Sequence, residues 1–237
     1  MTITVLYDNS SCAPSFRSGW GFSCLVDGRI LFDTGEAPDS LFHNMGQLNV
    51  NIENIEAVVF SHDHWDHTGG LWELLKKRKG LKVYACPGFS DDFKRQVIAL
   101  EGTLIESNGF QEIDARISVT GEIPGQYKGT YLPEQALIVK TESGIAVITG
   151  CSHPGIVTMI EKSKDVFPDM PIALALGGFH LKVENSETID SIASALMKMG
   201  VLKVGPTHCT GKNAQIIFQE RFGDRYIPIC AGKQLEV

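Results

Sequence analysis

The sequence predicts an α/β protein in which helices, two sheets and further helices form four layers, an αββα sandwich. Two observations predict it: short apolar runs pair as hairpins early in the chain, and apolar runs alternate with amphipathic stretches later. A sheet must bury one face against another layer, so two sheets with helices outside satisfy both patterns. The 237 residues contain no repeat, low-complexity tract or linker, so we expect a single domain over residues 1–237.

In the first half, the clearest element is a hairpin at residues 21–35. Its two apolar runs meet at Asp27-Gly28, a dipeptide that favours a tight turn. The other elements are apolar runs that predict strands and amphipathic runs that predict helices. We expect strands at 2–8, 56–60 and 82–86, and helices at 39–46, 71–79 and 90–100, the last capped by Ser90.

The second half begins with residues 101–135, which show no clear pattern and are rich in loop signals around Gly121, Pro124, Gly125 and Gly129. A second hairpin follows at 135–150, with its turn at Ser143-Gly144. Beyond it we expect helices at 155–167, 186–200 and 214–223, and strands at 171–178, 202–205 and 225–230. In the helix at 186–200 the apolar residues recur on one face, namely Ile189, Ile192, Ala193 and Leu196.

Composition limits the partners and the compartment. A net charge of −7 argues against a nucleic acid as partner. No apolar stretch approaches the roughly 20 residues of a membrane span, and the N-terminus lacks the features of a signal peptide. We therefore expect a cytoplasmic protein with no membrane partner, for which a homodimer is allowed. The six cysteines form no CxxC pair and are expected to be buried free thiols: Cys12, Cys24, Cys86, Cys151, Cys209 and Cys230.

The segment SHDHWDHTGG, residues 61–70, predicts a metal site. In an extended segment after a buried strand, His62 and His64 point to the same side, and Asp66 and His67 fall in the turn that follows. Protonated imidazoles repel one another and buried polar groups are costly, so such a cluster needs a cation to hold it together. Neutral imidazole and carboxylate are ligands that zinc accepts, with iron or manganese as alternatives.

Three more histidines follow apolar runs and small residues: His153, His180 and His208. Strand ends can meet at one edge of a sheet, so we predict His153 and His208 as ligands and His180 as a ligand or an acid/base that faces the substrate. One zinc needs only three or four protein ligands, so the full set indicates two divalent ions about 3.5–4 Å apart. The predicted ligands are His62, His64, Asp66, His67, His153 and His208, and the predicted catalytic residues are Asp66 and His180.

The motif SHDHWDH, with a strand before it and TGG after it, resembles the signature of the metallo-β-lactamase superfamily, and FDTG at residues 32–35 matches as well. The resemblance implies an αββα fold with a dinuclear site at one edge. It implies that Asp33 supports the metal loop without binding metal. It also implies that His62 and His64 serve the first ion, and that Asp66, His67 and His208 serve the second.

The sequence departs from the superfamily at residues 149–153, where TGCSH stands in place of a TGD that supplies a bridging aspartate. His153 would then serve the first ion without a carboxylate bridge, and Glu122 is a candidate replacement. The wider motif set, including TGEIP, TGCSHPGIV, LGGFHL and GPTHCTG, resembles the branch of dihydropterin–ribofuranosylaminobenzene phosphate synthases and uncharacterised metal-dependent hydrolases.

These resemblances imply an enzyme that acts on a small phosphate-bearing or ester substrate. In the first interpretation a metal-activated hydroxide attacks a phosphodiester or other ester, and His180 or Lys182 assists the leaving group. In the alternative a transferase condenses a dihydropterin with ribofuranosylaminobenzene phosphate. A further alternative is a non-catalytic or redox metal-binding protein in which Cys151 and Cys209 contribute thiol ligands.

Overall fold

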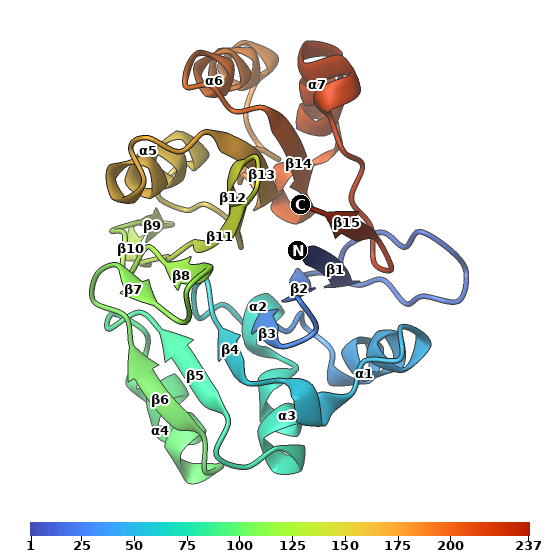
Figure 1. The fold of residues 1–237 in the computed structure, drawn as a ribbon, viewed down its shortest axis with the longest axis vertical. Helices are drawn as coiled ribbons and strands as arrows, with labels where there is room; N and C mark the ends of the chain where they lie inside the picture. Colours follow the sequence, from blue (N-terminus) through green and yellow to red (C-terminus); the bar gives the residue numbers. More distant parts are fainter. The chain divides into compact units, whose positions relative to one another are not determined.

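The computed structural model describes all residues, 1–237, and divides the chain into two compact units. The first unit comprises Met1–Asn108 and Ile229–Val237, and the second comprises Gly109–Pro228. Each unit contains one large sheet flanked by helices (Figure 1). None of the helices is long and apolar enough to cross a bilayer. That both units form one domain, as expected from the sequence, stays a prediction.

The first unit has a seven-stranded sheet in the order β15-β1-β2-β3-β4-β5-β6. Its strands are β1 (Thr2–Tyr7), β2 (Ser23–Val26), β3 (Ile30–Phe32), β4 (Ala57–Val59), β5 (Lys82–Ala85), β6 (Thr103–Glu106) and β15 (Gln234–Glu236). Its helices are α1 (Pro38–Gln47), α2 (Trp65–Thr68), α3 (Leu71–Lys77) and α4 (Asp91–Ala99), with a 3-10 turn η1 (Ile52–Asn54). Strands β3 to β6 run parallel, so the carboxyl ends of β3 and β4 lie at the same edge.

The second unit has a six-stranded sheet in the order β14-β13-β12-β11-β8-β7, and a separate ribbon of β9 and β10. Its strands are β7 (Gln111–Glu112), β8 (Ile117–Val119), β9 (Gln126–Tyr127), β10 (Thr130–Tyr131), β11 (Leu137–Thr141), β12 (Gly144–Thr149), β13 (Ile172–Gly178) and β14 (Lys203–Thr207). Its helices are α5 (Ile156–Val166), α6 (Ser186–Lys198) and α7 (Lys212–Phe222), with 3-10 turns η2 (His208–Thr210) and η3 (Gly223–Arg225). Strands β12, β13 and β14 run parallel.

Each sheet packs on its own helices through a separate apolar cluster. In the first unit the cluster joins α1, α3 and α4 to the strands, for example through Leu41, Leu74 and Val83. In the second unit Val147 of β12 packs in one cluster with Met159 of α5 and residues of α6 and α7. Burial of this apolar surface drives the association of helix and sheet. The two large sheets, each packed against helices, confirm the predicted mixed α/β class.

Many predicted elements are confirmed. The first hairpin turns at Asp27 and Gly28, whose φ angles are +47° and +70°, as a tight two-residue turn requires. The Ser90 side chain accepts a hydrogen bond from the N–H of Phe93 at 3.3 Å and so caps α4. On α6 the side chain of Ile189 is fully buried, in agreement with the apolar face.

Residues 101–135 contain β6 to β10, strands of two to four residues that are too short to show alternation, in a stretch that is otherwise mostly irregular. Two expectations about the chain were wrong. Residues 225–230 form no strand, since Pro228 lacks a backbone donor, and only Tyr226 makes an isolated bridge, to Val204. The turn after His64 is a short helix, α2.

The cysteines also differ from the expectation of six free thiols. A disulfide joins Cys12 to Cys230, which are 218 positions apart in sequence but whose Cα atoms lie 5.2 Å apart. Spacing alone cannot reveal such a pair. The remaining four cysteines are buried and outside any disulfide: Cys24, Cys86, Cys151 and Cys209.

We predict that unfolded protein purified without reductant contains the four thiols of these unpaired cysteines, and that reduction reveals all six. Because the bridge restricts the unfolded chain, its loss should lower the free energy of unfolding by about 2–5 kcal/mol. Thiol titration and denaturant unfolding of wild type and Cys12→Ser check this. Six reactive thiols before reduction would contradict the pairing.

Candidate metal centre

In the first unit the structure brings together the four residues of the HxHxDH motif. They follow β4 and continue into α2, with His64 at its N-cap. His62 and His67 are fully buried, and Asp66 is 5% exposed. The ring centroid of His62 lies 4.7 Å from that of His64 and 4.2 Å from that of His67. These side chains therefore form one compact group, which we call the first histidine group.

Asp33 holds this group by hydrogen bonds. Its Oδ1 accepts the N–H of Ser61 at 2.8 Å, and its Oδ2 accepts the Ser61 hydroxyl at 2.7 Å. Oδ2 also pairs with Nδ1 of His67 at 2.7 Å. A carboxylate that accepts from Nδ1 fixes the ring and leaves Nε2 as the ligand atom. These contacts agree with the supporting role expected for Asp33, and that Asp33 binds no metal stays a prediction.

The nitrogen and oxygen atoms of the first histidine group fit a divalent metal. Nε2 of His62 lies 3.2 Å from Nδ1 of His64. Two nitrogens bound to one tetrahedral zinc at about 2.0–2.1 Å lie about 3.3 Å apart, so this separation suits two ligands of one ion. Nε2 of His67 lies 3.6 Å from Oδ2 of Asp66, so an imidazole nitrogen and a carboxylate oxygen are also adjacent.

Two carboxylates close to the motifs in sequence have other contacts. Asp63, inside the HxHxDH segment, accepts the N–H of Ser90 at 2.8 Å and so supports the start of α4. Glu122 accepts the hydroxyl of Tyr131 at 2.7 Å. The sequence TGEIPG gives no sign that the Glu122 carboxylate pairs with the Tyr131 hydroxyl.

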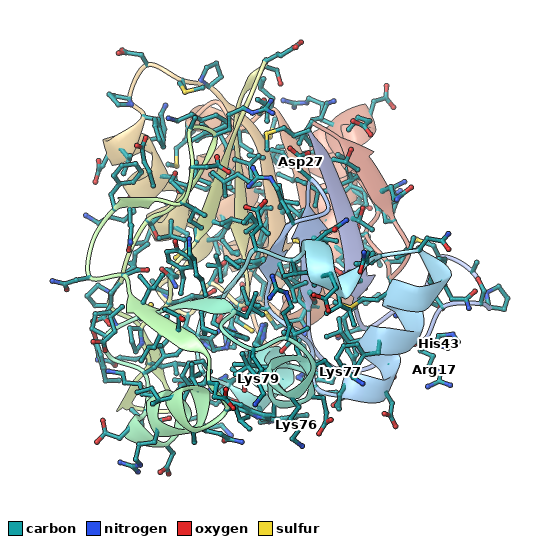
Figure 2. All side chains as sticks on the ribbon, turned by 60° about the horizontal axis from the view of Figure 1, so that its bottom comes forward. Arg17, Asp27, His43, Lys76, Lys77 and Lys79 are labelled. Atoms are coloured by element: carbon teal, nitrogen blue, oxygen red, sulfur yellow. A yellow bond between two sulfur atoms is a disulfide. The ribbon has the colours of Figure 1, made fainter.

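His43 lies on α1, where it is partly exposed. Its Nε2 contacts the carbonyl oxygen of Ser15 at 2.9 Å. Figure 2 shows His43 and Arg17 at the outside of α1, away from the strands of this unit. His43 is therefore a suitable control residue for experiments on the other histidines.

In the second unit the loops after β12, β13 and β14 bring five candidate ligand side chains to one edge of the parallel strands: Cys151, His153, His180, His208 and Cys209. The rings of His153 and His180 lie 4.4 Å apart by centroid. The ligand atoms of Cys151, His153 and His180 all lie within 4.8 Å of one another, and so do those of Cys151, His208 and Cys209. Cys151 is thus common to both of these sets.

Glu134 holds the loop after β12, and sequence reasoning missed it. Its side chain is fully buried, and its Oε1 accepts the N–H groups of Gly150, Cys151 and Ser152 at 3.1, 2.9 and 2.9 Å. Its Oε2 accepts the N–H of His153 at 2.8 Å. Successive backbone N–H groups that converge in this way form an anion-binding nest. The carboxylate therefore fixes the backbone that carries Cys151 and His153.

Four residues in these loops have a left-handed backbone conformation that side chains disfavour. The φ angles of Asp33, Ser152, His180 and His208 are +53°, +62°, +52° and +51°. Each such residue costs on the order of 1–3 kcal/mol and persists only where its surroundings enforce it, typically at functional sites. The strain therefore marks the same loops as the histidine motifs do.

His180 and Cys209 interact with each other. The hydrogen bond with Cys209 is the largest cause that raises the pKa of His180, followed by the opposing effect of burial and then by nearby negative charge. Burial alone would raise the pKa of the Cys209 thiol, but hydrogen bonds with Cys151 and His180 and the neighbouring histidines hold that pKa well below its usual range. The pKa values of the two groups thus shift in opposite directions, in large part through their contact with each other.

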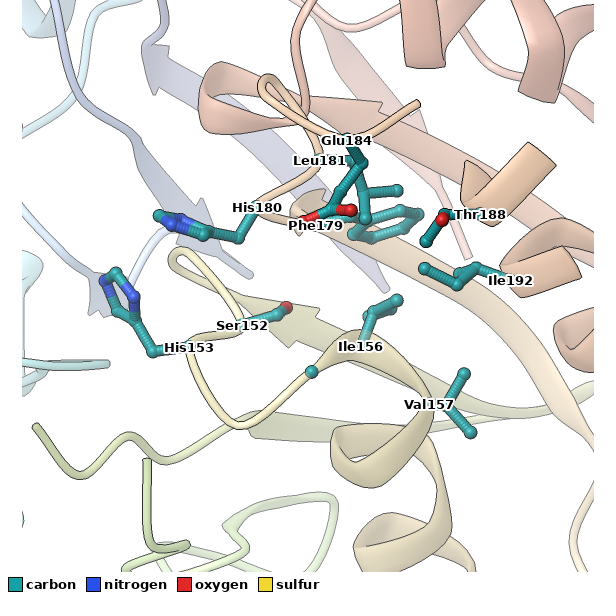
Figure 3. Close-up of a pocket in the computed structure, with 11 residues that line it drawn as sticks. Ser152, His153, Ile156, Val157, Phe179, His180, Leu181, Glu184, Thr188 and Ile192 are labelled. Atoms are coloured by element: carbon teal, nitrogen blue, oxygen red, sulfur yellow. The ribbon is translucent and has the colours of Figure 1, made fainter. Parts of the chain in front are cut away.

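A cavity of about 410 Å³ opens beside His153 and His180. Figure 3 shows both imidazoles at one end of it, while Phe179, Ile156 and Ile192 provide apolar walls farther in. Its volume falls within the range of about 300–1,000 Å³ that small-molecule sites occupy. The cavity could therefore hold the apolar part of a small substrate next to the histidines.

Comparison with known families finds a match at the start of the chain. The profile described as "Metallo-beta-lactamase superfamily" matches residues 23–89, which include FDTG and the HxHxDH motif. A crystal structure described as that of Tm1679, "a metal-dependent hydrolase of the beta-lactamase superfamily", superimposes with a TM-score of 0.85 at 31% identity, covering 100% of this chain and 99% of that chain.

A relative from Methanocaldococcus jannaschii is similar over almost the whole chain. It is named 7,8-dihydropterin-6-methyl-4-(beta-D-ribofuranosyl)-aminobenzene-5'-phosphate synthase and is 33% identical, covering 97% of this chain and 94% of that protein. The metallo-beta-lactamase fold protein YhfI from Bacillus subtilis superimposes with a TM-score of 0.69 at 16% identity, covering 99% of each chain, and shows a shared fold.

We predict that Glu134→Gln loosens the loop at residues 150–153. A glutamine NH₂ cannot accept the hydrogen bonds that one carboxylate oxygen accepts, and buried donors left unsatisfied cost about 1–3 kcal/mol. Denaturant unfolding should show a loss of that size. Glu142→Gln, in the exposed turn between β11 and β12, should leave stability unchanged. Equal stability of the two variants would argue against the role of Glu134.

Proposed function

Because the chain belongs to the metallo-β-lactamase superfamily and is a metal-dependent hydrolase or a related transferase, we propose that it hydrolyses a phosphodiester or other ester of a small molecule. The observation that carries this proposal is the pair of His153 and His180 beside a cavity of about 410 Å³. The cavity would receive the substrate, and the imidazoles would lie at its reacting end.

We propose that the enzyme uses two divalent ions per chain, with zinc as the first candidate. Bound divalent ions would supply an acidified water and would stabilise negative charge that develops on the substrate. The spacing of the His62 and His64 nitrogens supports metal binding in the first unit. The proposed ligands are those predicted from the sequence: His62, His64, Asp66, His67, His153 and His208.

His180 is the proposed general acid. Its raised pKa, caused first by the hydrogen bond with Cys209, keeps the protonated ring populated closer to neutral pH. A protonated imidazole at the end of the cavity can donate its proton to the leaving-group oxygen as the ester bond breaks. As pH rises through this raised pKa the proton is lost, so the contribution of His180 to the rate should fall on the alkaline side.

Asp66 is the second proposed catalytic residue. Its carboxylate is nearly buried, and Oδ2 lies 3.6 Å from Nε2 of His67. In that position it can orient an attacking water and accept its proton while His67 stays fixed by Asp33. The apolar walls of the cavity, including Phe179, would exclude competing water from the apolar part of the substrate.

A transferase is the second candidate, and the near full-length similarity to the methanogen synthase favours it. In that reaction a dihydropterin with a pyrophosphate leaving group would condense with ribofuranosylaminobenzene phosphate. The same cavity could hold a flat ring against Phe179, and the same histidines would lie at the reacting end. One site geometry can serve both reactions, so only product analysis separates them.

The test of function combines metal content with product analysis. Metal-free protein is reloaded with zinc, manganese or iron(II), and elemental analysis should show saturation at two ions per chain. The reloaded protein is then incubated with bis(p-nitrophenyl) phosphate, p-nitrophenyl phosphate, p-nitrophenyl acetate, or a dihydropterin pyrophosphate with and without the aminobenzene substrate.

Metal-dependent release of p-nitrophenol from the diester or the carboxylic ester supports the hydrolase. Release of pyrophosphate only when both synthase substrates are present supports the transferase and overturns the hydrolase. Saturation at a single ion contradicts the proposal of two ions per chain.

We predict different outcomes for two histidine substitutions. His180→Ala should keep the metal content and lower turnover by about 10²–10⁴-fold, the usual loss for a missing acid or base. His208→Ala should lose or loosen a metal, which elemental analysis detects. His43→Ala, at the surface, serves as control and should match wild type in both measurements. Loss of metal from His180→Ala would instead make His180 a ligand.

A further inference from the structure

The cavity beside His153 and His180 has a single acidic residue in its lining, Glu184. Apart from the two histidines, the other lining residues are apolar or neutral, and no lysine or arginine is among them. Figure 3 shows the histidines at one end and Thr188 at the other, with the Glu184 carboxylate between them in this view. The cavity therefore combines apolar walls with one carboxylate.

The backbone on both sides of Glu184 is held in place. The N–H of Glu184 donates to the carbonyl oxygen of Leu181 at 3.1 Å and closes a tight turn. Leu181 is buried in the apolar cluster of this unit. On the other side Asn185 caps α6, since its side chain accepts the N–H of Thr188 at 2.9 Å. The carboxylate of Glu184 is thus attached to an ordered backbone, although the residue itself is exposed.

The charge of Glu184 acts on any molecule that occupies the cavity. Walls of low dielectric constant concentrate the field of a charge and attract a group of opposite sign. The pKa of His180 is raised first by Cys209, and Glu184 makes a small contribution in the same direction, so its negative charge reaches the histidine end. A cationic group is therefore favoured beside Glu184, and an anionic phosphate is disfavoured there.

We propose that Glu184 binds a cationic nitrogen group of the substrate, so that the enzyme prefers small esters with an ammonium or amidinium group on an apolar body. The inference rests on the proposed function, because it takes this cavity as the substrate site, and it adds the chemical class of the substrate. The apolar body would lie against Phe179 and Ile192, and the ester would face His153 and His180.

Binding of three ligands with the same aromatic ring tests this charge preference without any activity. They are phenethylamine, phenethyl alcohol and hydrocinnamate, which are cationic, neutral and anionic at neutral pH. Nuclear magnetic resonance of labelled isoleucine methyl groups follows each titration, because Ile156 and Ile192 line the cavity. The amine should bind more tightly than the alcohol by about two- to fivefold, the range for an exposed ion pair, and hydrocinnamate should bind most weakly.

Substitutions assign the preference to the Glu184 carboxylate. Glu184→Gln should bind the amine and the alcohol equally, and Glu184→Lys should prefer hydrocinnamate. Glu187→Gln, exposed in the first turn of α6 and outside the cavity, is the matched control and should keep the wild-type order. The methyl spectra also verify that each variant is folded.

Three results would overturn the proposal. One is equal affinity of the wild type for the amine and the alcohol, or no binding of either. Another is a preference for the amine that persists in Glu184→Gln. The third is binding that leaves the methyl signals of both Ile156 and Ile192 unchanged, because the ligand would then lie outside the cavity.

Kinetics of the metal-loaded enzyme separate this proposal from the proposed function. The p-nitrophenyl diester of phosphocholine carries a cationic nitrogen, and ethyl p-nitrophenyl phosphate is its counterpart without that charge. Glu184→Gln should raise KM for the phosphocholine diester by about two- to fivefold more than for the ethyl diester, and an equal change for both would contradict the role of Glu184. A wild type that releases no p-nitrophenol yet prefers the amine would count against phosphodiester hydrolysis and support the cation site.

Discussion

A buried carboxylate that accepts hydrogen bonds from a histidine-bearing loop is the interaction on which each unit's site depends. Asp33 accepts three such bonds and Glu134 accepts four. A buried charge without partners costs several kcal/mol, and a loop with unsatisfied N–H groups is also unstable. Carboxylate and loop therefore stabilise each other, and this mutual support can sustain the disfavoured backbone at Ser152.

Close approach of backbones completes the arrangement in the second unit. A Cβ atom on Gly178 would lie 2.3 Å from the carbonyl oxygen of Gly150 and 2.6 Å from Sγ of Cys209. Only glycine allows the end of β13 to pass between the loop after β12 and turn η2. The N–H of Phe179 then bonds to the Thr210 hydroxyl at 2.9 Å. The loop after β12, the end of β13 and turn η2 are thus packed against one another. These backbone contacts hold the segment that carries His180.

Sequence patterns predicted the parts of this arrangement that are local. Alternation and helical periodicity located most strands and helices, and the HxHxDH spacing brought His62 and His64 together. The role of Glu134 was beyond reach, because four N–H groups converge on it only after the strands pair. The Cys12–Cys230 bridge depends on the same kind of long-range contact. The contact between His180 and Cys209 joins loops that follow different strands.

The cavity walls have a different origin from the histidine-bearing loops, and this separation bears on specificity. Phe179, which lines the cavity, packs edge-on against Phe218 of α7 at 5.5 Å between centroids, and Ile156 belongs to the same apolar cluster. The wall thus extends from the core, whereas His153 and His180 are placed by loop hydrogen bonds and strained backbone. Core substitutions can reshape the cavity while the loops stay fixed. The same histidines could then serve hydrolysis or condensation, according to which substrate the wall admits.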